Sequence, residues 1–231
     1  MNDYQIRPIA HIESDFTTKF GIPRQAGIAE TLEANIVFEK EFRNPDALRG
    51  IEAFSHLWLI WQFSENLRSD WSPTVRPPRL GGNKRVGVFA TRSPFRPNAL
   101  GLSCVRLVRL DRDGERGTFL VVAGADLMNG TPVFDIKPYI PYTDCRVDAL
   151  SGFAPDSGET LNVEFTGDTK ALVPEDRIDA LVTVLANDPR PRYQHDSGRI
   201  YAMEFAGMEI SFTVGGGICR VTEITKNPKQ P

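Results

Sequence analysis

Cysteine and histidine are scarce in this chain, and long apolar runs are missing. Three cysteines lie far apart, at positions 104, 145 and 219, and the three histidines lack the spacing of metal ligands. We therefore expect reduced structural thiols, no disulfide framework and no bound metal. No apolar stretch of about 18 residues is present, and the N-terminal sequence lacks the basic and apolar regions of a secretory signal. We expect a cytoplasmic protein that does not enter a membrane.

Acidic residues are missing from one long window. Residues 71–110 contain no Asp or Glu but hold eight Lys and Arg, although the whole chain has a net charge of -3. Such a cluster is either a solvated face of strands and loops or a surface that binds phosphates. Pro and Gly alternate with the arginines in residues 76–82, which holds the guanidinium groups at fixed spacing and favours the phosphate-binding alternative.

Short strand signals dominate the first 150 residues. The clearest are residues 51–63, 85–89, 103–110 and 118–123, with Asp113-Gly114 as a hairpin tip between the last two. Amphipathic helices do not separate them, so the pattern predicts an antiparallel sheet or a closed barrel. The sequence contains neither GxGxxG nor the Walker pattern, and Gly215-Gly216-Gly217 is followed by no helix signal, so a doubly wound nucleotide-binding domain is not expected.

Residues 151–160 have the composition of a linker, and the pattern changes after them. Apolar residues with helical spacing, Ile178, Leu181, Val182 and Leu185, predict a helix over 174–187. Residues 199–205 and 209–214 predict a hairpin, so the expected tail is αββ. The predicted fold class is mainly β, with an antiparallel β-barrel domain at residues 1–150 and a small α+β domain at residues 161–231.

Two segments of the first domain have the composition of a site. Residues 86–102 form a proline-stiffened loop with two arginines, which is either a long turn or a rigid binding loop. In the second segment, residues 126–139, an extended backbone would place Val133, Asp135, Lys137 and Tyr139 on one face. That row of polar groups is suited to a polar substrate, and an exposed ion pair between Asp135 and Lys137 is the alternative.

The same segments resemble a known family. Residues 20–27, 50–58, 76–83, 86–101 and 130–139 resemble the TsaA-like family and, within it, the bacterial TrmO group, and residues 187–193 extend the similarity into the tail. The resemblance implies a homodimeric β-barrel methyltransferase. It implies that S-adenosylmethionine is the cofactor and that the reaction is N6-methylation of threonylcarbamoyladenosine at position 37 of tRNA. The alternatives are a non-catalytic RNA-binding barrel and a regulator that binds S-adenosylmethionine without transferring its methyl group.

Site residues follow from this resemblance by matching motif. The positions expected to bind the cofactor are Pro23, Arg24, Gln25, Ser64, Glu65, Arg92, Leu102, Val133, Phe134, Asp135 and Ile136. Arg24 or Arg92 suits the cofactor's carboxylate, and Asp135 suits its cationic groups. For catalysis we expect Lys137 and Tyr139, beside Asp135, to orient or polarise the acceptor N–H.

The expected RNA partner is the anticodon stem-loop, which presents backbone phosphates and unstacked bases. Basic residues of the acid-free window are expected to follow its backbone, namely Arg76, Arg79, Lys84, Arg85 and Arg96. The second domain is expected either to close over the loop with Arg190, Arg192 and Tyr193 or to serve only hydrophobic packing.

Overall fold

The computed structural model describes residues 4–67, 70–154, 160–190 and 196–227. Strands make up most of its regular structure, which confirms the prediction of a mainly β chain. In the described residues, no helix is long and apolar enough to cross a membrane.

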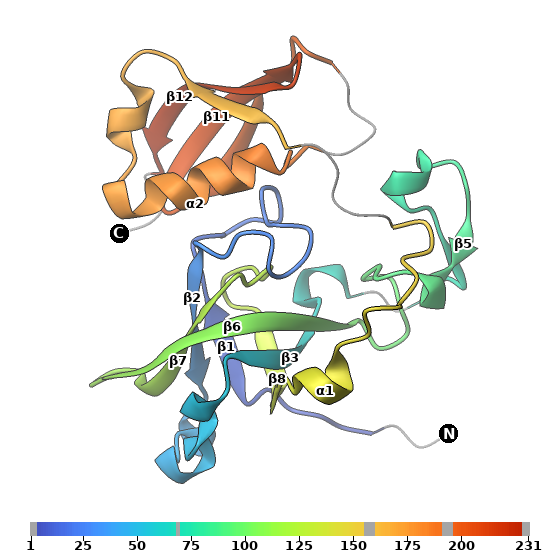
Figure 1. Cartoon of the computed structure of the whole chain (residues 1–231), viewed down its shortest axis with the longest axis vertical. Helices are drawn as coiled ribbons and strands as arrows, with labels where there is room; N and C mark the ends of the chain where they lie inside the picture. The colour runs from blue at the N-terminus through green and yellow to red at the C-terminus, as the bar shows by residue number, and fades with distance from the viewer. Residues whose placement is uncertain (1–3, 68–69, 155–159, 191–195, 228–231) are drawn as a thin grey trace.

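Six antiparallel strands form the N-terminal half (Figure 1). They are β1 (Ala10–Glu13), β2 (Glu33–Phe38), β3 (His56–Gln62), β6 (Leu100–Asp113), β7 (Gly117–Ala123) and β8 (Pro132–Pro138). The hydrogen-bonded order is β1-β2-β7-β6-β3-β8, and β1 also pairs with β8, so the ring of strands closes into a barrel. Alternate residues of β3 point inward, where Leu57 and Leu59 join a core that is out of contact with water.

Short helical elements lie in the connections of both halves of the chain. The 3-10 helices are Lys40–Phe42, Pro45–Leu48, Ile51–Ala53, Ser64–Asn66, Pro78–Leu80, Val88–Ala90 and Thr169–Leu172, and a one-turn helix, α1, covers Pro141–Asp144. Strands β4 (Thr74–Val75) and β5 (Val86–Gly87) form a separate two-stranded sheet. Two of the expected strands are therefore shorter than predicted, because residues 51–53 and 88–90 adopt 3-10 turns.

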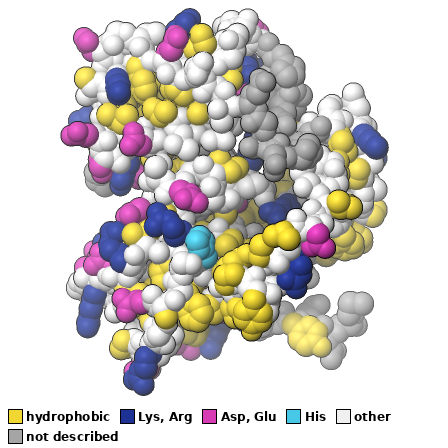
Figure 2. Space-filling model, viewed as in Figure 1, with side chains coloured by type: hydrophobic (Ala, Val, Ile, Leu, Met, Phe, Trp, Pro, Cys, Tyr) yellow, Lys and Arg dark blue, Asp and Glu magenta, His cyan; other side chains and the backbone are white. Residues whose placement is uncertain are grey.

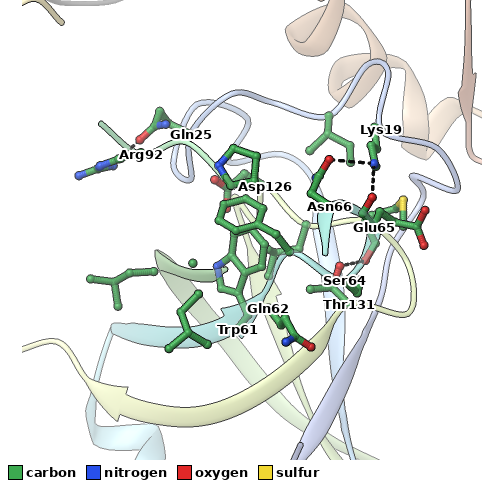
Figure 3. Close-up of a pocket in the computed structure, with 18 of the residues that line it drawn as sticks. Lys19, Gln25, Trp61, Gln62, Ser64, Glu65, Asn66, Arg92, Asp126 and Thr131 are labelled. Carbon is green, nitrogen blue, oxygen red and sulfur yellow. Dashed lines mark hydrogen bonds between the residues drawn. The ribbon is translucent and has the colours of Figure 1, made fainter. Parts of the chain in front are cut away.

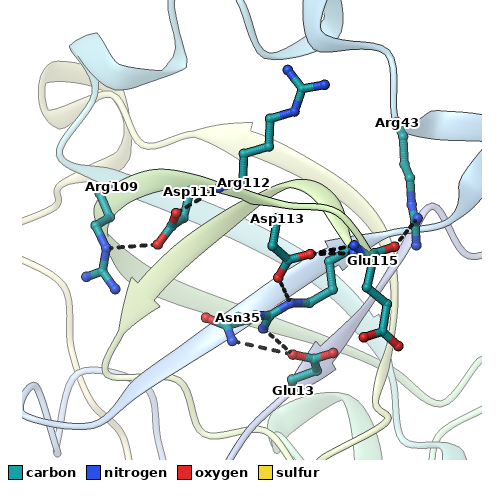
Figure 4. Close-up of polar contacts among 9 residues, drawn as sticks. Glu13, Asn35, Arg43, Arg109, Asp111, Arg112, Asp113 and Glu115 are labelled. Atoms are coloured by element: carbon teal, nitrogen blue, oxygen red, sulfur yellow. Dashed lines mark hydrogen bonds and ion pairs between the residues drawn. The ribbon is translucent and has the colours of Figure 1, made fainter.

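The tip of the β6–β7 hairpin lies at Asp113-Gly114, as predicted (Figure 4). The Asp113 carboxylate accepts hydrogen bonds from the backbone N–H groups of Glu115 and Arg116, and it pairs with the Arg116 guanidinium at 2.6 Å. Arg116 also reaches Glu13 on β1, at 2.9 Å. Asp side chains commonly stabilise turns through such local bonds to the backbone.

The C-terminal half holds a four-stranded sheet and one long helix. Its elements are β9 (Asn162–Phe165), α2 (Glu175–Ala186), β10 (Tyr201–Phe205), β11 (Met208–Gly215) and β12 (Ile218–Lys226), with the strand order β10-β11-β12-β9. The predicted helix and the β10–β11 hairpin are confirmed. The αββ prediction is wrong because it lacks β9 and β12. Strand β12 pairs with β11 across a turn in which Gly216 and Gly217 both have positive φ, and β9 adds in parallel to β12.

A loop from the N-terminal half completes the C-terminal core. Phe16, Ala29 and Leu32 are buried in the same hydrophobic cluster as α2 and the four-stranded sheet. The carboxylate of Asp15 pairs with Arg177 of α2 at 3.0 Å. The loop between β1 and β2 therefore connects the barrel to the C-terminal half.

Candidate cofactor and RNA site

A cavity of about 750 Å³ opens at one end of the barrel (Figure 3). Four segments line it: residues 19–25 of the β1–β2 loop, residues 58–66 at the end of β3, residues 91–102 at the start of β6, and residues 126–131 before β8. Its volume is within the range of sites that hold small molecules or cofactors. All four segments overlap stretches that the sequence analysis singled out.

Trp61 forms an inner wall of the cavity. It lies directly opposite Gly101 in the β3–β6 register, and its ring contacts Phe63 edge-on at 4.3 Å between centroids. A Cβ atom at Gly101 would be 2.3 Å from the Trp61 ring, so only glycine fits there. The indole N–H donates to the Ser103 hydroxyl at 3.0 Å. These contacts give the cavity a fixed aromatic surface.

Asp126 is a partly buried carboxylate in the cavity wall. Its carboxylate accepts a 2.6 Å hydrogen bond from Ser103, which completes a Trp61–Ser103–Asp126 relay. Burial raises the pKa of Asp126, and the hydrogen bond from Ser103, the N–H of Ala26 and the charge of Arg92 oppose that rise. Asp126 is the first residue of the 126–139 segment, but the sequence alone gives it no role. Only the strand register brings it to Ser103.

Three of the predicted cofactor residues form one chain of contacts at the cavity edge. The Arg92 guanidinium donates to the Gln25 side chain, and the Gln25 amide donates to the carbonyl of Arg24 at 2.6 Å. Arg24 in turn donates to the carbonyl groups of Asp188 and Arg190, just after α2. Two guanidinium groups thus lie at the edge of the cavity.

A second group of predicted residues lies across the cavity. Ser64 and Glu65 belong to the 3-10 helix that follows β3, and Lys19 fixes that helix by donating to the carbonyl of Glu65 at 2.8 Å and to Asn66 at 3.1 Å. Pro23 and Leu102 also line the cavity, and the Leu102 side chain is 56% exposed. Seven of the expected cofactor positions therefore meet at one site: Pro23, Arg24, Gln25, Ser64, Glu65, Arg92 and Leu102.

The β8 residues are arranged differently from the expectation. The register between β3 and β8 shifts at Ile60 and Trp61, so that Trp61 faces Val133 while Ile60 faces Asp135. Val133 is therefore fully buried in the barrel core, not on the face of Asp135 and Lys137 as predicted. Phe134, at the register shift, and Ile136, which packs against the same core, do not line the cavity either.

Asp135 and Lys137 form an ion pair at 2.9 Å, with most of the lysine side chain exposed. They lie opposite Ile60 and Trp58, both cavity-lining residues, and opposite residues of paired strands share a face. The predicted catalytic row therefore borders the cavity wall without entering it. Tyr139 follows the end of β8, where burial, the thiols of Cys145 and Cys104 and the carboxylate of Asp144 raise the pKa of its phenol.

The predicted RNA-binding residues are dispersed. Arg76, Lys84 and Arg85 lie on the segment around β4 and β5, and Arg85 donates to the Thr74 hydroxyl at 2.8 Å. Arg96 lines the cavity and braces its loop through the carbonyl of Thr91. Arg190 is only 11% exposed in its side chain and forms an ion pair with Asp188, so its charge is already compensated. Arg192, Tyr193 and the side chain of Arg79 lie outside the described residues.

Comparison with known proteins identifies the family of this chain. The family model described as the tRNA-methyltransferase O N-terminal domain matches residues 11–145, and the TrmO C-terminal domain matches residues 158–227. The chain belongs to the TrmO family. A relative named tRNA (adenine(37)-N6)-methyltransferase, from Escherichia coli, is 41% identical over 88% of this chain and 90% of its own length.

Other TrmO-family relatives agree with this assignment. A Pseudomonas aeruginosa protein named as a putative S-adenosylmethionine-dependent methyltransferase, RcsF, is 38% identical over 90% of this chain and 91% of its own. The crystal structure of TrmO from Pseudomonas aeruginosa superposes with a TM-score of 0.79 at 31% identity, over 97% of this chain and 99% of that one.

Proposed function

We propose that this protein is an S-adenosylmethionine-dependent tRNA methyltransferase that acts on N6 of threonylcarbamoyladenosine at position 37. Membership of the TrmO family supports the reaction, because relatives that cover nearly the whole chain carry the name tRNA (adenine(37)-N6)-methyltransferase. The observation that carries the proposal in this chain is the cavity, where the motif residues of three separate segments meet. A cytoplasmic location follows from the tRNA substrate.

The cavity has the chemistry that S-adenosylmethionine requires. The cofactor has a carboxylate, two cationic groups and an adenine ring. Arg24 and Arg92 lie at the mouth for the carboxylate, Asp126 offers an inner negative charge, and Trp61 offers an apolar aromatic surface. When bound, the cofactor supplies an electrophilic methyl group on sulfur. The part of the protein is then to hold the acceptor nitrogen in line with that methyl group.

Lys137 and Tyr139 are the residues that we place at the acceptor. The acceptor N–H lies in a urea-type group whose lone pair is delocalised, so a nearby cation favours its deprotonated form. Lys137 carries such a charge beside the cavity wall, and Asp135 orients it. The raised pKa of Tyr139 keeps its phenol protonated and able to donate a hydrogen bond. Val133 and Ile136 pack in the barrel core next to this row.

A homodimer accounts for an apolar face beside α1 (Figure 2). Hydrophobic side chains gather there. Tyr142 of α1, Val147, Leu150 and the cavity-lining Leu102 are each more than half exposed. Exposed apolar surface of this kind is typical of an interaction site. Asp144 of α1 accepts a hydrogen bond from Trp58, which lines the cavity opposite Lys137, so a partner on this face would lie beside the cofactor site. In this proposal residues 1–150 form the catalytic domain and residues 161–231 the small accessory domain.

Nucleoside mass spectrometry tests the reaction. Purified protein is incubated with S-adenosylmethionine and tRNA that carries threonylcarbamoyladenosine, and the digested tRNA is analysed for the methylated nucleoside. We expect one added methyl group on that nucleoside. Binding of tRNA without any methyl transfer would favour the non-catalytic RNA-binding barrel. Binding of S-adenosylmethionine with neither tRNA binding nor transfer would favour the regulator.

A further inference from the structure

Two aromatic rings lie exposed on the segment around β4 and β5. We call residues 71–91 the basic projection, because they extend from the barrel at the right edge of Figure 1. Trp71 and Phe89 lie at its two ends with their rings stacked, 6.1 Å between centroids and 28° between planes. They are 51% and 72% exposed. Large aromatic side chains usually bury most of their surface, so an exposed stacked pair requires an explanation.

The backbone holds this pair in place. The N–H of Val88 donates to the carbonyl of Pro73 at 3.0 Å, and β4 pairs with β5 between the two aromatic residues. Both rings are therefore presented by a braced hairpin rather than by a loose loop. A preformed platform loses little conformational entropy when a flat ligand binds it.

All the charged residues within the basic projection are positive, although Asp70 lies directly before it. Within the basic projection the sequence has no Asp or Glu, and the basic residues include Arg76, Lys84 and Arg85. Among the described ion pairs, none involves these three side chains, in contrast to Arg109 and Arg190, which pair with carboxylates. The combination of free positive charge and an open aromatic face suits single-stranded nucleic acid, whose bases stack on the rings while its phosphates meet the cations.

We propose that Trp71 and Phe89 form a stacking platform for an unpaired base of the anticodon loop, next to the nucleotide that enters the cavity. The inference rests on the proposed tRNA substrate. Phe89 is two residues before Thr91, which lines the cavity, so their Cα atoms are at most about 7 Å apart. A base on the platform would therefore be close to the cavity mouth. Paired RNA hides its base faces, so the platform selects a loop over a duplex.

Binding of RNA to the full-length protein tests the platform. The probes are an anticodon stem-loop and a fully paired RNA of equal charge, measured with wild type, Trp71→Ala and Phe89→Ala. Each variant should bind the stem-loop about 5- to 100-fold more weakly, because one base–aromatic stack is lost, and should bind the duplex normally. The matched control is Tyr4→Ala, which removes an aromatic ring that is 92% exposed elsewhere.

Salt dependence separates stacking from charge. Trp71→Ala should lower affinity equally at low and high salt, whereas Lys84→Glu should reduce the slope of log affinity against log salt, by about 0.7 or more. Trp71→Phe should restore most of the affinity. Since both rings are largely exposed, the melting temperatures of both alanine variants should stay near that of wild type. If Trp71→Ala fails to fold, the RNA affinity of Phe89→Ala alone tests the platform.

The outcomes distinguish this proposal from the proposed function. Wild-type binding by both aromatic variants, together with methylation at the wild-type KM, would overturn the platform and leave the methyltransferase in place. Weakened self-association in light scattering, with unchanged RNA affinity, would show that the pair is a protein contact and would also overturn it. If the wild type itself neither binds nor methylates tRNA, the proposed function fails. The expected result is a raised KM for tRNA with little change in the affinity for S-adenosylmethionine.

Discussion

Substitution of Gly101 by alanine tests whether the cavity wall is as rigid as the strand register implies. The new Cβ atom would lie 2.3 to 2.7 Å from three atoms of the Trp61 ring, well inside van der Waals contact. Trp61 cannot move away freely, because Phe63 packs against its ring and Ser103 accepts its indole hydrogen bond. The strand or the ring must therefore shift, and the Trp61–Ser103–Asp126 relay breaks with it.

The cost follows from two terms. Overpacking of a core costs about 1–3 kcal/mol, and loss of the hydrogen bond to Ser103 adds about 1 kcal/mol. For a chain of this size, a loss of about 2–4 kcal/mol lowers the melting temperature by about 4–16 °C. Circular dichroism would measure this shift, and calorimetry should find weaker binding of S-adenosylmethionine. The control is Gly114→Ala, where an added Cβ meets nothing within 4 Å. Equal melting and equal cofactor affinity for Gly101→Ala and wild type would refute the assignment of Trp61 as a fixed wall.

Three other substitutions test the charges around the site. Arg92→Ala should reduce the rise in melting temperature that S-adenosylmethionine produces, because it removes a cation for the cofactor's carboxylate; an undiminished rise would exclude that contact. Burial raises the pKa of Asp126 in the folded chain, so the fold favours the protonated carboxyl over the carboxylate. The resulting contribution to the free energy of unfolding is fully present below the unfolded pKa of about 3.9 and is lost as the pH rises through the folded pKa. Asp126→Asn should therefore gain melting temperature relative to wild type between pH 4 and pH 7, and a constant difference would contradict this. Lys137→Ala should lower the rate of single-turnover methylation about 100-fold at saturating cofactor and tRNA. A rate within about threefold of wild type would exclude Lys137 from the reaction. Its remaining role would be the exposed ion pair with Asp135, which contributes at most about 1 kcal/mol to stability.

Local patterns predicted the elements whose signals lie within one stretch of sequence. Helix α2 follows from the spacing of its apolar residues, and the β6–β7 hairpin follows from Asp113-Gly114. Strand β9 was missed because only four residues form it and its partner β12 lies more than fifty residues later. Strand β12 was missed because Gly215-Gly216-Gly217 was considered only as a possible phosphate-binding loop. Gly216 and Gly217 instead form the hairpin turn between β11 and β12.

At the site, too, local motifs predicted some residues, while others depend on contacts between distant strands. Motif matching found the segments at 23–25, 64–65 and 92–102, which the fold brings together around the cavity. It did not find Asp126, because the contact with Ser103 depends on which residues of β6 point inward. It also placed Val133 beside Asp135, since a strict two-residue period cannot include the register shift between β3 and β8. Arg190 was expected to bind RNA, although its ion-pair partner, Asp188, is only two residues away.

The β1–β2 loop gives the C-terminal half a direct connection to the cavity. Its first part is buried against the C-terminal core through Phe16, and its middle part places Arg24 at the cavity edge. Arg24 donates to the carbonyl groups of Asp188 and Arg190, so the end of α2 fixes the arginine that we assign to the cofactor's carboxylate. Asp188 in turn adopts a positive φ and holds the Arg190 side chain in an ion pair. Arg190, which we expected at the RNA, thus stabilises the turn that positions Arg24. If Arg24 binds the cofactor's carboxylate as we propose, the C-terminal half contributes to cofactor binding by positioning this arginine.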